Sequence, residues 1–159
     1  MLHRIACGLH TRGVSTLRFN YRGVGASEGI FEGGDAEVDD VRAAIDHVAR
    51  DHDEVALVGY SFGAWVGLRA GADDPRVGRL VGLSLPIGPL DVAPLRSIRR
   101  PLLLVHGERD AWGELAAIVA FAAAIGANAE VTAVAGGDHG FQGRLDAAAA
   151  PAVAFVAGG

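Results

Sequence analysis

The stretch EVALVGYSFGAWVGL, residues 54–68, places the motif Gly-x-Ser-x-Gly between two apolar runs. Residues 54–58 contain two β-branched valines and predict a short buried strand, and residues 64–70 predict the beginning of an apolar helix. The 23 glycines and 5 serines of this 159-residue chain would produce about 0.1 accidental copies of the motif. The motif alone is weak support for a nucleophilic serine, and its position between a predicted strand and a predicted helix strengthens that support. A strand, a tight turn and a helix are therefore predicted to meet at Ser61.

Two glycines, Gly59 and Gly63, flank Ser61 in this turn. A sharp strand-to-helix turn has a strained backbone, and glycine leaves room where other side chains would collide. The free N–H groups and the dipole of the following helix favour developing negative charge, so we expect the N–H of Phe62 to serve as one donor of an oxyanion hole. The alternative is a plain turn rich in small residues, in which Ser61 has no chemical role.

The composition is that of one globular domain covering residues 1–159. Half of the residues are hydrophobic and 21% are charged. No stretch is apolar enough to span a membrane, and polar residues interrupt the apolar N-terminal segment MLHRIACGLH, which makes it a poor signal peptide. We therefore expect a cytoplasmic protein with no membrane partner.

The charges and the cysteine count exclude several classes of protein. The net charge is −5 and the 14 arginines are scattered along the chain, which argues against nucleic acid as a partner. There is no lysine, which excludes a lysine Schiff base and the lysine of a phosphate-binding P-loop. Cys7 is the single cysteine, so no internal disulfide and no cysteine-based zinc cluster can form. We expect it to be an inert thiol in the core.

Strands and helices alternate along the whole chain. This order predicts an α/β fold, a three-layer sandwich with a mainly parallel sheet whose ligand site lies beyond the carboxyl ends of the strands. Besides the elements around Ser61, the pattern predicts helices at 2–9, within 34–52, at 114–125 and at the C-terminus, strands at 14–19, 80–85, 102–105 and 130–134, and a proline-broken segment at 86–101.

Ser61 needs a base, because a neutral serine hydroxyl is a weak nucleophile. Asp110 follows the predicted strand at 102–105, and His139 follows the predicted strand at 130–134. The chain order Ser, Asp, His is that of α/β-hydrolases and differs from the orders in chymotrypsin-like and subtilisin-like proteases. We expect His139 to take the proton of Ser61 and Asp110 to orient the imidazole.

The same loops contain other candidate residues. Glu108 lies closer to the strand than Asp110, and Asp138 is adjacent to His139, which is a poor position for orienting its ring. His106 is interpreted as a strand-end residue. A metal site built from His106, Asp110 and His139 lacks a closely spaced ligand pair on a helix, so we expect no metal.

The loop NYRGVGASEG raises the question of a dinucleotide cofactor. Gly23, Gly25 and Gly29 follow a predicted strand, but their spacing is Gly-x-Gly-x-x-x-Gly and not the Gly-x-Gly-x-x-Gly of dinucleotide-binding loops. We therefore expect no cofactor.

Four segments together resemble the α/β-hydrolase superfamily: LRFNYRGVGASEG, GYSFGA, LLLVHGERD and GGDHGFQGRL. They are most similar to small bacterial cytosolic hydrolases related to dienelactone hydrolases and serine esterases. The resemblance implies a serine hydrolase that cleaves an ester, thioester or related acyl bond of a small molecule through an acyl-enzyme. The shortness of residues 86–101 predicts a minimal lid.

The resemblance also implies that the chain is truncated at its N-terminus, with a compact natural variant as the alternative. Family members carry further strands before the first helix predicted here, and the loop before that helix supplies a second oxyanion N–H. One of those strands lies between the strands that match 14–19 and 54–58, so we expect these two to lose their common neighbour. Direct pairing, a second chain in a homo-oligomer, or water would then satisfy their backbones. The alternative function is a catalytically impaired or non-catalytic fragment that acts as a binding module.

Overall fold

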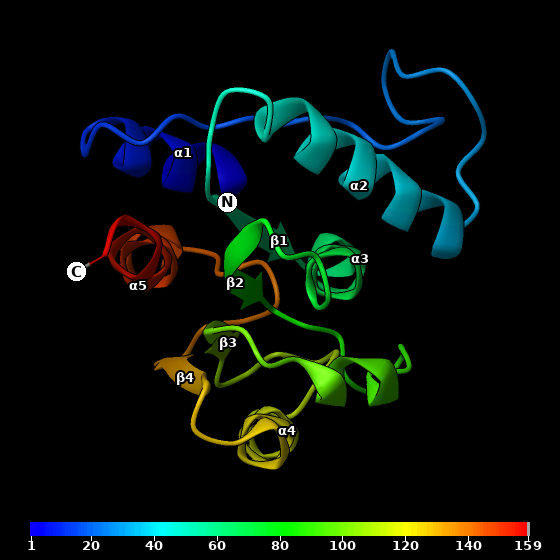
Figure 1. The fold of residues 1–159 in the computed structure, drawn as a ribbon. Helices are drawn as coiled ribbons and strands as arrows, with labels where there is room; N and C mark the ends of the chain where they lie inside the picture. Colours follow the sequence, from blue (N-terminus) through cyan, green and yellow to red (C-terminus); the bar gives the residue numbers. More distant parts are fainter. Residues whose placement is uncertain (159) are drawn as a thin grey trace.

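Figure 1 shows the computed structural model, which describes residues 1–158. Its elements are α1 (Leu2–His10), α2 (Asp35–Val48), β1 (Val55–Tyr60), α3 (Phe62–Gly71), β2 (Val77–Leu83), a 3-10 helix (Ala93–Ser97), β3 (Leu102–Gly107), α4 (Leu115–Ile125), β4 (Ala129–Val134) and α5 (Leu145–Ala157). The helices and strands predicted from residue 34 onward lie within a few residues of these bounds.

The four strands form one parallel sheet in the order β1-β2-β3-β4. Helices α1 and α5 cover one face, and α2, α3 and α4 cover the other (Figure 1). This arrangement confirms the predicted three-layer α/β fold.

Apolar side chains point to both faces of the sheet. Leu102 and Leu104 join the core under α2, α3 and α4, while Leu103 and Val105 join the core under α1 and α5. Successive residues of a strand face opposite sides, so a sheet covered on both faces needs apolar residues at every position. This explains the unbroken run LLLV at 102–105.

The prediction of a strand at 14–19 is wrong. In the described chain this segment belongs to no sheet, although it contains three residue types that favour strands: valine, threonine and phenylalanine. A strand is stabilised by hydrogen bonds to a neighbour, and β1 lies across a cavity from this segment rather than beside it. The strand-favouring composition of residues 14–19 therefore has no neighbouring strand to pair with.

The cavity between the two, here named the β1 groove, has a volume of about 850 Å³ and is bounded by residues 14–19 on one side and β1 on the other. The N–H of Ser61 donates to the carbonyl oxygen of Leu83 on β2. Because backbone groups alternate in direction along a strand, those of Ala56, Val58 and Tyr60 point away from β2 and toward the groove. Within residues 1–158, the β1 edge of the sheet thus has no strand beside it.

Cys7 is exposed, which corrects the expectation of a core thiol. The buried face of α1 consists of Ile5, Ala6 and Leu9, and Cys7 lies on the opposite side of the same helix. Its sulfur lies 3.7 Å from Nε2 of His3, one turn earlier.

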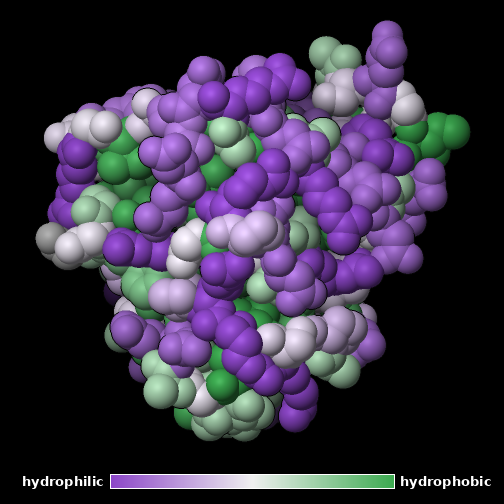
Figure 2. Space-filling view, viewed as in Figure 1, coloured by the Kyte–Doolittle hydropathy of each residue, from purple (hydrophilic) through white to green (hydrophobic). Residues whose placement is uncertain are grey.

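The surface is mainly hydrophilic on the face shown in Figure 2, with hydrophobic residues between the polar ones. Val24, Ile30 and Phe31 are exposed on the loop that precedes α2. Within residues 1–158, no helix has both the length and the apolar composition needed to cross a membrane.

Candidate active site

Ser61 occupies a sharp turn between β1 and α3. Its φ of 53° lies in the left-handed region, which is strained for a residue with a side chain. A Cβ atom added to Gly59 would lie 2.3 Å from the carbonyl oxygen of Gly63 and 2.5 Å from the Cα atom of Ala64. Glycine at position 59 is therefore required for β1 and α3 to approach this closely.

The hydroxyl of Ser61 is free for a partner outside the helix. Ser61 is the residue that precedes α3, where a serine commonly accepts a hydrogen bond from the first helical turn. Here the side chain makes no such bond, and the backbone carbonyl oxygen of Ser61 instead accepts from the N–H of Ala64 at 2.9 Å. Oγ is therefore available to a partner outside α3.

Asp110 lies in the loop after β3 with a fully buried side chain. Its Oδ1 atom accepts a hydrogen bond from the backbone N–H of Trp112 at 2.8 Å. The loop is tied to the loop after β4, because the N–H of Arg109 donates to the carbonyl oxygen of Gly137 at 2.8 Å. A Cβ atom on Gly107 would lie 2.4 Å from that same oxygen, so glycine permits the two loops to touch.

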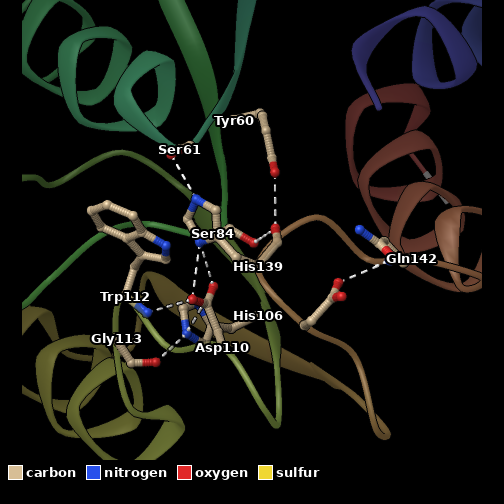
Figure 3. A network of polar contacts seen from close by, with 10 residues as sticks. Tyr60, Ser61, Ser84, His106, Asp110, Trp112, Gly113, His139 and Gln142 are labelled. Atoms are coloured by element: carbon tan, nitrogen blue, oxygen red, sulfur yellow. Dashed lines mark hydrogen bonds and ion pairs between the residues drawn. The ribbon is translucent and has the colours of Figure 1, made fainter.

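His139 links the other two side chains (Figure 3). Its Nε2 atom lies 2.8 Å from Oγ of Ser61, and its Nδ1 atom lies 2.9 Å from both carboxylate oxygens of Asp110. A carboxylate only accepts hydrogen bonds, so Nδ1 carries the proton and Nε2 is the acceptor for the hydroxyl of Ser61. The structure thus brings together the three residues selected from the sequence.

Two residues that the sequence interpretation did not select hold the backbone of His139. The hydroxyls of Tyr60 and Ser84 each donate to the carbonyl oxygen of His139 at 2.9 Å (Figure 3). Burial raises the pKa of Tyr60, and the nearby carboxylates of Asp110 and Asp138 raise it further, so this phenol stays a neutral donor at neutral pH. The position of Tyr60 directly before Ser61 is the one sequence signal that could have indicated it.

The alternative residues have other contacts. Glu108 accepts from the N–H of Gly136, and Asp138 accepts from the N–H of Gln142. His106 lies on β3 as expected, with Nε2 at 2.7 Å from the carbonyl oxygen of Gly113 and 3.6 Å from Oδ2 of Asp110. It therefore lies behind Asp110 and belongs to the support of the Asp110 loop.

The structure bears on the two alternatives raised by the sequence, a dinucleotide-binding loop and a metal site. Gly23, Gly25 and Gly29 all have positive φ angles, and the next helix begins only at Asp35. In a dinucleotide-binding loop the glycines open the helix directly. Among residues 1–158, no group of three or more His, Cys, Asp or Glu side chains is arranged to hold a metal ion.

Comparisons with known proteins identify the family and the fold. The family model described as alpha/beta hydrolase domain matches residues 1–151. An alpha-beta serine hydrolase homologue from Coxiella burnetii is 30% identical, with a TM-score of 0.89 over 98% of this chain and 75% of its own. A Xanthomonas campestris protein, described as an a/b serine hydrolase without lid, is 28% identical, with a TM-score of 0.85 over 97% of this chain and 70% of its own.

A curated relative is similar over a shorter length. An uncharacterized protein from Rickettsia prowazekii is 31% identical over an alignment of 104 residues, and the match covers 62% of this chain and 44% of that protein. The chain therefore covers less than half the length of this relative.

Proposed function

The chain belongs to the alpha/beta hydrolase family, and we propose that it is a serine hydrolase that cleaves ester, thioester or related acyl bonds of small molecules. The observation that carries the proposal is the row of hydrogen bonds from Asp110 through His139 to Ser61, with polar distances of 2.8 and 2.9 Å. Such a row raises the nucleophilicity of a serine hydroxyl that is otherwise inert at neutral pH.

In the proposed first half-reaction, Oγ of Ser61 attacks the acyl carbon while Nε2 of His139 takes its proton. The negative charge that develops on the carbonyl oxygen is stabilised by the N–H of Phe62 in the first turn of α3, where N–H groups have no helical acceptor. The bond from the acyl carbon to the leaving group then breaks. The leaving group departs with the proton from His139, and an acyl-enzyme on Ser61 remains.

In the second half-reaction, water attacks the acyl-enzyme. His139 takes a proton from the water and returns it to Oγ of Ser61 as the acid is released, so the enzyme ends in its starting state. Asp110 keeps Nδ1 protonated throughout and stabilises the imidazolium that forms in both half-reactions. The whole chain is proposed to act as a single domain with at most a small lid at 86–101.

The test is the reaction of Ser61 itself. Incubation with a fluorophosphonate should attach one label to Ser61, and 4-nitrophenyl acetate should give a burst of nitrophenol equal to the enzyme concentration. Ser61→Ala should remove both signals. The matched control is Ser97→Ala, which deletes an exposed hydroxyl that bonds to the carbonyl oxygen of Pro94, and it should retain both.

A folded chain that shows neither labelling nor a burst would contradict the proposal and favour the non-catalytic binding module. The proposal names one oxyanion donor, the N–H of Phe62, and an enzyme that loses a single such donor typically turns over about 10²–10³-fold more slowly. A slow steady state after a full burst is therefore compatible with the proposed chemistry, whereas the absence of both the burst and the label is not.

A further inference from the structure

Trp112 stands beside the imidazole that the proposed mechanism uses (Figure 3). Its indole centroid lies 5.8 Å from that of His139, with an interplanar angle of 42°, and the residue is 56% exposed. The ring therefore lies next to the proton-transferring group and has a free surface that another molecule can contact.

The backbone of Trp112 is held on both sides. Its N–H donates to Oδ1 of Asp110, and the carbonyl oxygen of the next residue, Gly113, lies 2.7 Å from Nε2 of His106. A Cβ atom on Gly113 would lie 3.2 Å from Cγ2 of Ile87, so this part of the loop is packed against the segment after β2. The exposed indole is thus carried by a backbone whose position is coupled to Asp110.

The proton transfer determines which part of a substrate meets this ring. In the first half-reaction His139 delivers a proton from Nε2 to the leaving-group atom, so that atom must lie within hydrogen-bond distance of Nε2. The rest of the leaving group then extends from the imidazole over the neighbouring surface. Trp112 provides an aromatic face at that place.

We propose that Trp112 determines leaving-group specificity, and that the preferred substrates are esters whose alcohol portion carries an aromatic ring. This inference rests on the proposed serine hydrolase function. Offset-stacked and edge-to-face aromatic pairs have centroid separations of 4.5–7 Å, and a ring on the alcohol side can pair with the indole in this way. The acyl group remains bonded to Ser61 after the leaving group has departed, so Trp112 affects acylation only.

The test compares benzyl acetate with ethyl acetate, which share the acyl group and differ in the ring of the alcohol. Trp112→Ala should lower kcat/KM for benzyl acetate by about tenfold and for ethyl acetate by less than about twofold. Trp112→Phe, which keeps an aromatic ring, should retain most of the preference. The rate of deacylation, measured on the acetyl-enzyme common to both substrates, should not change.

The matched control is Val119→Ala, which removes exposed apolar surface from α4 and should leave both rates at the wild-type value. Equal losses of Trp112→Ala with the two esters, no loss with either, or slower deacylation would overturn this inference alone. A wild-type chain with neither ester turnover nor fluorophosphonate labelling would overturn the proposed function as well, so the two failures can be distinguished.

Discussion

The two sides of strand β1 differ in how its backbone groups are satisfied. From β1 to β4 every strand has a neighbour, and the side chains of Ser61, Asp110 and His139 meet at the carboxyl ends of these paired strands. On the other side of β1, the groove separates an unpaired edge from residues 14–19. The candidate triad is therefore positioned by the paired strands and does not require an occupied groove.

Amide hydrogen exchange measures this contrast directly and should show the largest effect. The N–H groups of Ala56, Val58 and Tyr60 face the groove and should exchange about 10³-fold faster than those of Leu80 and Gly82 on the central strand β2. The reason is that exchange from an unpaired amide needs no opening of the sheet. Equal protection on β1 and β2 would show that the groove is closed in solution and that the contrast does not exist.

Leucine truncation on the two sides should give the next largest effect. Leu104→Ala removes a side chain that is 1% exposed in the core and should lower the free energy of unfolding by about 3 kcal/mol. Leu17→Ala removes one that is 48% exposed beside the groove and should change it by less than about 0.5 kcal/mol. Denaturant unfolding of both variants provides the measurement. Similar losses would mean that residues 14–19 contribute to the core as a strand would.

The turn that carries Ser61 can be disturbed through a single glycine, Gly59, at the end of β1. Gly59→Ala introduces a Cβ atom into the backbone of α3 and should lower the rate of fluorophosphonate labelling by about 10²-fold or more, because Ser61 must move. Gly67→Ala on α3 meets no atom within 4 Å and is the control, which should label at the normal rate. Normal labelling of Gly59→Ala would contradict the requirement for glycine.

The smallest effect is expected from the hydroxyls that hold His139. Tyr60→Phe and Ser84→Ala each remove one donor to its carbonyl oxygen and should lower kcat/KM by about tenfold, through small displacements of the imidazole. Ester hydrolysis by the single and double variants gives the measurement. If kcat/KM of both single variants and of the double variant equals that of the wild type, the backbone of His139 is held by other contacts and these hydroxyls have no positioning role.

Local sequence was sufficient for the elements whose causes are local. Gly59 and Gly63 around Ser61 predicted the turn because its constraint is steric and lies within five residues. The apolar run at 102–105 predicted β3 because a strand covered on both faces is apolar at successive positions. The order Ser61, Asp110, His139 predicted a shared site because the carboxyl ends of parallel strands lie at one edge.

Tertiary structure alone decided the remaining features. Residues 14–19 have the composition of a strand, yet hydrogen bonds to a neighbour are what make a strand, and β1 lies across the groove from them. Ser84 and Tyr60 reach one carbonyl oxygen only because the register of β1 and β2 places their ends under the His139 loop. Contacts between residues that are distant in sequence depend on the packing of the whole sheet, and no periodicity within a single segment records them.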